Sequence, residues 1–183
     1  MMVTGILSVQ SEAITRVKRP PVVIARVLAM AIAAAATVSV PPVQAARRPA
    51  PPFTLTLLDG KTLRLADLKG SSVILLFWAP WCPTCNAEAA SWEREYREWQ
   101  GKGVSLVGIG LLDNRAAVER FMRQYHLTFP TGYDADGSIA KAYGFTVQPF
   151  WAWIAPDGTL LRAAYGPADG EELDAAFHTL SGR

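Results

Sequence analysis

The sequence predicts an α/β domain with a mixed central sheet flanked by helices, carried behind an N-terminal export segment. Half of its 183 residues are apolar, which is enough apolar surface to offset the entropy lost on folding and excludes a disordered chain. In the first half of the body, continuous apolar runs typical of buried strands alternate with stretches of helical periodicity. A hairpin and a helix follow, so strands are expected to run in both directions.

The first 45 residues are expected to be a signal peptide or a membrane anchor helix. Residues 22–40 form a nearly continuous apolar run that follows a basic segment. Small residues at the recognised positions predict cleavage near Ala45. The run is also close to the roughly 20 residues that span a bilayer, so an uncleaved anchor is the alternative. The chain would then touch the membrane only through residues 22–40. Both readings export the body to an extracytoplasmic or periplasmic space, where disulfides persist.

The charge distribution gives no reason to expect a nucleic-acid partner. The formal net charge is only +2, and its basic excess belongs to the N-terminal segment, which holds Arg16, Lys18, Arg19 and Arg26. The rest of the chain lacks the basic patch that a nucleic-acid binder needs. The presence of only two cysteines also excludes a disulfide-rich miniprotein and a four-cysteine zinc site.

A proline-rich stretch, residues 46–52, is expected to be a linker, and the folded body is expected at 53–183. The body opens with residues 53–57 and 61–65, in which apolar and polar residues alternate around an Asp-Gly pair. That pattern predicts an N-terminal hairpin. Further strands are expected at 72–78, 104–110, 150–155 and 159–164, and helices at 87–100, 116–125, 136–143 and 171–180.

Two cysteines carry the most informative chemistry, in the segment WAPWCPTC that ends at Cys85. Cysteines three positions apart at the start of a helix share a face and can form a disulfide. The helix N-terminus favours a thiolate, so Cys82 is expected to be the attacking nucleophile and Cys85 the resolving thiol. Pro83 suits the first helical position, and Pro83 and Thr84 together help to set the redox poise.

Other interpretations of the cysteine pair are less well motivated. A metal half-site would need two more ligands from a partner chain. A static disulfide across so short a loop would restrict the unfolded chain little. An inert buried pair would not be expected between two tryptophans and two prolines. We therefore expect a redox-active disulfide between Cys82 and Cys85, with no metal and no organic cofactor, since the dithiol carries the electrons.

The chain resembles the TlpA/ResA/DsbE group of exported thiol–disulfide oxidoreductases, which have a thioredoxin fold. The resemblance covers about residues 50–183 and is carried by FWAPWCPTC at 77–85, YGFTVQP at 143–149 and the strand and Pro-Asp-Gly turn that follow. It implies a cis peptide bond before Pro149, which would face the cysteines with the backbone of Gln148 beside the sulfurs. A substrate peptide could pair with that exposed backbone.

The resemblance also indicates where clients bind and where the chain departs from the family pattern. Clients are expected to bind in a cleft that has two sides. Trp81, Pro83 and Thr84 form one side, and Gln148 and Pro149 form the other. Gln148 replaces a smaller or β-branched residue, and Trp151 and Trp153 replace a threonine and a leucine. These departures concern substrate preference rather than the chemistry.

An acid that accepts the proton of the second thiol is implied at Asp113. Cytoplasmic thioredoxins place such an aspartate six residues before the first cysteine, where this chain has Leu76. The exported reductases resemble each other in an acid after the next strand, and Asp113 matches that position. In a semi-buried site its pKa would be raised and it could act as a base. The alternative is a loop aspartate that caps the following helix.

These observations predict an exported thiol–disulfide oxidoreductase whose clients are proteins with thiols or disulfides. As a reductant it would keep the thiols of apocytochrome c free before haem attachment and would need a membrane thiol electron donor. As an oxidant it would form disulfides in exported proteins and would need a membrane electron acceptor. Resemblance of WCPTC to the cytochrome-c-maturation group favours reduction. The alternatives are a redoxin-type peroxide reductase and a tethered binding module that uses the cleft between Trp81 and Pro149 without turnover.

Overall fold

The computed structural model describes residues 48–168, 171, 174–175 and 178–179, all within one compact unit that spans 44–183. The export segment expected at 1–45 and much of the last expected helix, 171–180, lie outside these residues. Within the described part, no helix combines the length and the apolar character needed to cross a membrane.

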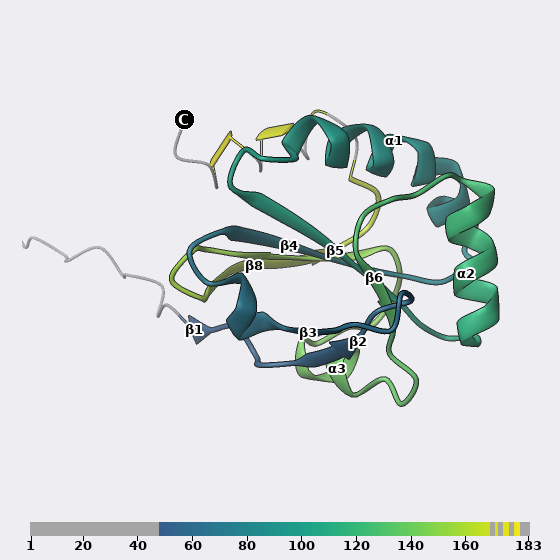
Figure 1. Cartoon of the computed structure of the whole chain (residues 1–183), viewed down its shortest axis with the longest axis horizontal. Coiled ribbons are helices and arrows are strands. Elements are labelled where there is room, and N and C mark those ends of the chain that lie inside the picture. Colours follow the sequence, from purple (N-terminus) through teal and green to yellow (C-terminus); the bar gives the residue numbers. More distant parts are fainter. Residues whose placement is uncertain (1–47, 169–170, 172–173, 176–177, 180–183) are drawn as a thin grey trace, which may run out of the picture. The chain divides into compact units, whose positions relative to one another are not determined.

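A six-stranded mixed sheet forms the centre of this unit (Figure 1). Its spatial order is β1-β8-β7-β4-β5-β6. The neighbours β4, β5 and β6 run parallel, whereas β7 is antiparallel to β4 and β8 is antiparallel to β7. The mixed direction predicted from the sequence is confirmed. The strands are β1 (Arg48–Pro49), β4 (Ser72–Trp78), β5 (Val104–Gly110), β6 (Thr131–Tyr133), β7 (Phe150–Ile154) and β8 (Thr159–Tyr165).

Helices and the predicted hairpin cover the two faces of the sheet. The longer helices, α1 (Pro83–Trp99) and α2 (Arg115–Gln124), lie on one side in Figure 1. On the other side lie the hairpin β2–β3 (Thr54–Thr56 and Thr62–Arg64) and α3 (Ser138–Ala142), with the short 3-10 helix η3 (Leu65–Leu68) next to the hairpin.

The apolar run of β4 explains why the sheet is central. All seven of its residues are buried, and alternate side chains enter two separate cores. Leu76 and Trp78 pack on the α1 side, whereas Leu75 and Phe77 pack on the hairpin side. A strand buried on both faces must be apolar throughout, and each such side chain contributes about 1.5–3 kcal/mol through burial. This strand leads directly into the cysteine segment.

Trp151 and Trp153 are core residues that pack beneath α1. Trp151 contacts Trp92 of α1 edge-to-face, with ring centroids 6.1 Å apart, and stacks on Trp153 at 6.3 Å. Trp92 in turn packs on Trp78 at 6.5 Å. Because Trp151 and Trp153 are both buried, their departure from the family pattern changes the packing of the core rather than a surface that clients touch.

The structure differs from the sequence predictions at three places. Arg48–Pro49 pairs with β8, and the N–H of Ala50 donates to the carbonyl of Gly158 at 2.9 Å, so the expected linker partly belongs to the body. Prolines suit such an edge strand because they need no partner for an N–H. Helix α1 begins at Pro83, four residues earlier than expected, and β6 was not predicted.

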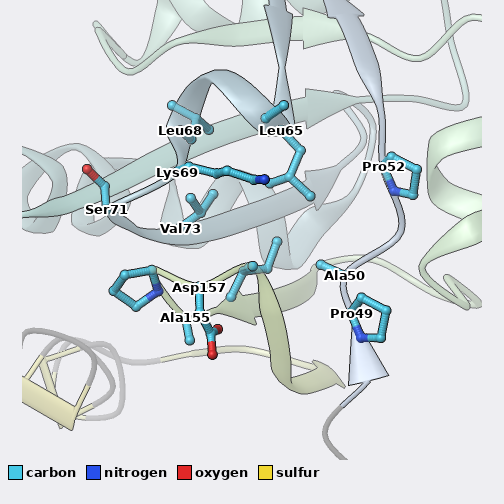
Figure 2. A pocket seen from close by; sticks show the side chains of 14 residues that line it. Pro49, Ala50, Pro52, Leu65, Leu68, Lys69, Ser71, Val73, Ala155 and Asp157 are labelled. Carbon is cyan, nitrogen blue, oxygen red and sulfur yellow. The ribbon is translucent and has the colours of Figure 1, made fainter.

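The β1 segment also forms one wall of a cavity of about 330 Å³. Its lining is mostly apolar and includes Pro52, Leu68, Val73 and Ala155 (Figure 2). Val73 lies at the start of β4, whereas Cys82 follows the end of that strand. The cavity is therefore at the opposite end of β4 from the cysteines and takes no part in their chemistry.

Candidate active site

Cys82 is the N-cap residue of α1, and its side chain is the cap. Its sulfur accepts the backbone N–H of Cys85 at 3.3 Å, and Pro83 occupies the first helical turn as predicted. Unpaired N–H groups and the positive end of the helix dipole stabilise negative charge at this position. The Cys82 side chain thus lies where a thiolate is favoured, although the residue is only 4% exposed.

Cys85 lies one turn further along α1 and is completely buried. Burial raises the pKa of Cys85, and so does the hydrogen bond that its thiol makes with the sulfur of Cys82. Both cysteines are free thiols in this structure. The buried thiol therefore keeps its proton while the neighbouring sulfur can carry charge, which is the asymmetry expected of a resolving and an attacking cysteine.

The segment before β7 faces these sulfurs. The peptide bond between Gln148 and Pro149 is cis, as the resemblance implied, and the sulfur of Cys82 lies 4.0 Å from the carbonyl oxygen of Gln148. The carbonyl of Pro149 accepts the N–H of Gly166 at 2.9 Å, which ties this segment to the end of β8. Folding thus brings together Cys82 and the Gln148-Pro149 pair, 66 residues apart in sequence.

Three exposed apolar residues, Trp81, Leu112 and Val147, form what we call the apolar rim. Trp81 precedes Cys82 and contacts Leu112, whereas Val147 precedes Gln148, whose carbonyl oxygen lies 4.0 Å from the sulfur of Cys82. Trp81 is 55% exposed, and its indole N–H donates to the carbonyl of Leu112 at 2.9 Å. Leu112 is also 55% exposed and adopts a positive φ of 58°, which places an L residue in an uncommon backbone conformation. Leu112 and Val147 were missed by sequence reasoning because only folding brings them near the cysteines.

The remaining residues of the predicted client site flank the nucleophile. Pro83 is exposed and Thr84 is half-buried. Both lie between the two cysteines in the chain. In the described ranges, the His, Cys, Asp and Glu side chains form no group of three that could hold a metal ion.

Asp113 lies away from the cysteine that it was expected to serve. It is exposed, and its carboxylate accepts the backbone N–H and the side-chain amide of Asn114, both at 2.8 Å. Asn114, not Asp113, caps α2 by accepting the N–H of Ala117. Among the contacts of the described residues, none joins Asp113 to the buried Cys85, so the expected base role stays a prediction without geometric support.

Glu88 is the carboxylate whose charge acts on the resolving thiol. It lies three residues after Cys85 on α1, is half-buried, and raises the pKa of Cys85 through its negative charge. The resemblance had instead indicated Asp113 as the acid that serves this thiol. The spacing of i and i+3 places the side chains of Cys85 and Glu88 on one helix face and was the signal that could have found Glu88.

The comparisons with known proteins agree with this geometry. A model of the AhpC/TSA family matches residues 46–165. The chain belongs to the AhpC/TSA family. Within it, the chain is similar to the thiol-disulfide oxidoreductase ResA of Bacillus thuringiensis subsp. konkukian (strain 97-27), with 35% identity over 125 residues that cover 68% of this chain and 72% of ResA.

The chain is also similar to solved structures. MTB DsbF, in its mixed oxidized and reduced forms, is 32% identical, with a TM-score of 0.66 over 70% of this chain and 94% of DsbF. A secreted disulfide oxidoreductase of Mycobacterium tuberculosis, homologous to E. coli DsbE, is 34% identical, with a TM-score of 0.64 over 70% of this chain and 96% of that protein. The chain is a thiol–disulfide oxidoreductase with a thioredoxin-like fold, and its substrates are protein thiols and disulfides.

Proposed function

We propose that this oxidoreductase acts outside the cytoplasm and reduces disulfides of exported proteins, with Cys82 as nucleophile and Cys85 as resolving thiol. The observation that carries the assignment is the sulfur of Cys82 capping α1 while a buried, protonated Cys85 lies directly beside it. Similarity to the secreted disulfide oxidoreductase of Mycobacterium tuberculosis supports export, as does the apolar run at residues 22–40. Whether that run is cleaved near Ala45 or kept as an anchor does not alter the chemistry.

The reaction transfers two electrons from the dithiol to the client. The Cys82 thiolate attacks one sulfur of a client disulfide, forms a mixed disulfide and releases one client thiolate. Cys85 then loses its proton, attacks the sulfur of Cys82 and releases the second client thiolate. We assign the acceptance of that proton to Glu88, because it is the carboxylate that acts on Cys85. A membrane dithiol of lower potential returns the two electrons.

The surroundings of Cys82 support an extended client segment. Pro149 has no N–H, and the Gln148 carbonyl lies beside the sulfur, so a strand-like peptide can lie along this backbone. The exposed apolar side chains of the rim fit apolar residues next to the client cysteine. Among such clients we propose apocytochrome c, on the resemblance of WCPTC to the cytochrome-maturation group.

Trapping clients tests the direction of electron flow. A Cys85→Ala form of the full chain, expressed in its native host, should accumulate mixed disulfides with exported proteins. Recovery of proteins whose cysteines are needed as free thiols supports reduction, whereas recovery of proteins with stable structural disulfides supports the oxidase alternative. Peroxide consumption by the purified chain would favour a peroxide reductase. Full activity of a Cys82→Ser, Cys85→Ser double variant in vivo would favour a binding module.

A further inference from the structure

Asn86 and Tyr125 form a hydrogen-bonded pair that holds the backbone of the catalytic loop, residues 79–82 between β4 and α1. Asn86 directly follows Cys85 on α1, and its side-chain amide donates to the carbonyls of Pro80 and Cys82 at 3.0 and 2.7 Å. The Asn86 carbonyl oxygen accepts the hydroxyl of Tyr125 at 2.8 Å. One side chain thus links the loop that carries the nucleophile to α2.

The chemistry of these groups leaves the Asn86 amide only one orientation. The carbonyls of Pro80 and Cys82 can only accept, so the NH₂ group must face them, and a flipped amide would place oxygen against oxygen. The oxygen of Asn86 then needs a donor, which is the hydroxyl of Tyr125. Since each group fits one role, loss of the Tyr125 hydroxyl removes the interaction that holds the amide in place.

Helix α2 holds the loop at two points. Tyr125 is the C-cap residue of α2, and its ring packs on Phe121, 4.7 Å between centroids. The carbonyl of Leu112, two residues before the N-cap of α2, accepts the indole N–H of Trp81. A surface pocket of about 240 Å³ lies between the loop and α2, and its lining includes Pro80 and Trp81 of the loop and Phe121 of α2. The two hydrogen-bonded contacts thus join the loop to the region of α2 on either side of this pocket, in addition to the packing of Ala79 and Cys82 in the core.

We propose that Asn86 and Tyr125 are positioning residues that keep the sulfur of Cys82 aligned with the first N–H groups of α1. The backbone of Cys82 is held on both sides: its N–H donates to the carbonyl of Ala79 at 3.1 Å, and its carbonyl accepts both the backbone N–H of Asn86 at 3.0 Å and the side-chain amide of Asn86 at 2.7 Å. Fixing that backbone fixes the direction of the Cα–Cβ bond, and with it the distance from the sulfur to the N–H of Cys85. The inference rests on the proposed role of Cys82 as nucleophile.

The test is the pH profile of Cys82 alkylation by iodoacetamide in the reduced full-length chain, read by peptide mass spectrometry. Asn86→Ala should move the midpoint of the profile to higher pH and slow alkylation at neutral pH about threefold to tenfold, which corresponds to one hydrogen bond lost at the loop. Tyr125→Phe removes only the hydroxyl and should shift the profile in the same direction by less. The double variant should match Asn86→Ala, because both changes act through one contact.

Tyr96→Phe is the matched control. Tyr96 also lies on α1 and packs edge-on against Phe129, 5.8 Å between centroids, so its hydroxyl should not affect Cys82. A wild-type midpoint in both Asn86→Ala and Tyr125→Phe, with only thermal stability lowered, would overturn the proposal, and so would additive effects in the double variant. Alkylation needs no client. A chain that alkylates as expected but fails to reduce disulfides would refute the proposed function and leave this inference standing.

Discussion

The backbone N–H of Cys85 donates to the sulfur of Cys82 over 3.3 Å, while the thiol of Cys85 itself is completely buried. Both side chains are buried, but the sulfur of Cys82 accepts an N–H of the first turn of α1, whereas the thiol of Cys85 is fully desolvated. Donors favour the thiolate, whereas burial favours the thiol. The order of attack follows from this difference in environment.

Burial of the Cys85 thiol should make the reduced protein less stable at alkaline pH. Burial raises the pKa of Cys85 above its value in the unfolded chain. Below about pH 8.5 the thiol is protonated in both states and its contribution is fully present. At higher pH the unfolded chain ionises first, so the contribution is lost as the pH rises through the folded value.

Urea unfolding of the reduced chain at several pH values measures this loss. Cys85→Ala should lose less stability than the wild type between about pH 8 and 10. Burial also raises the pKa of Tyr143, so Tyr143→Phe should reduce the loss only above about pH 10. Equal slopes for the wild type and Cys85→Ala would contradict the buried, protonated thiol.

Removal of the Glu88 charge should slow the second step of exchange. Glu88 is the carboxylate whose charge acts on Cys85, and general-base assistance is worth about 10²-fold or more. Glu88→Gln should therefore prolong the life of a mixed disulfide between Cys82 and a small thiol, measured by rapid acid quench. Asp113→Asn, a neutralised exposed carboxylate, should leave that lifetime unchanged. A longer lifetime in Asp113→Asn, with no change in Glu88→Gln, would contradict the assignment and support Asp113 as the base.

The exposed apolar rim should determine how tightly clients bind. Leu112→Ser should raise KM for an apolar, disulfide-containing peptide about threefold to tenfold, because part of the buried contact is lost. Its kcat should change little, because the sulfurs are not touched. Leu161→Ser is the control, since Leu161 is comparably exposed, at 50%, but lies on β8 outside the rim. Equal effects of the two substitutions would show that the rim has no special part in recognition.

Close packing of α2 against β5 requires glycine at position 110. A Cβ at Gly110 would lie 2.7 Å from both γ carbons of Val118. Gly110→Ala should therefore destabilise the fold by about 1–3 kcal/mol, as overpacking does in other cores. The second substitution Val118→Ala should recover part of the loss, measured by urea unfolding. A neutral Gly110→Ala would indicate that α2 can shift away from β5 without cost.

The sequence predicted the parts of the fold that a local pattern encodes. The strands at 72–78 and 104–110 were predicted to the residue, because their apolar runs match burial on the sheet. The cysteine pair and the helix after it were likewise expected from a local motif, and the cis bond at Pro149 was implied by the family resemblance. The three-residue β6 was not expected, since so short a strand has no period and forms by pairing with β5.

Contacts between distant segments explain what the sequence could not predict. Leu112 takes part in the site because its carbonyl accepts the indole of Trp81 across 31 residues. Tyr125 reaches the loop through Asn86 across 39 residues. Neither residue carries a motif. Asp113 was chosen by its position in the chain, whereas the carboxylate that acts on Cys85 lies one helical turn away.

Mapping the mixed disulfide gives the most direct test of the order of attack. The reduced Cys85→Ala and Cys82→Ala forms would each be mixed with a disulfide-linked peptide at neutral pH, acid-quenched and analysed by mass spectrometry. The account predicts that Cys85→Ala rapidly forms a stable adduct on Cys82, while Cys82→Ala remains unmodified over the same time. Equal or faster adduct formation on Cys85 would contradict it.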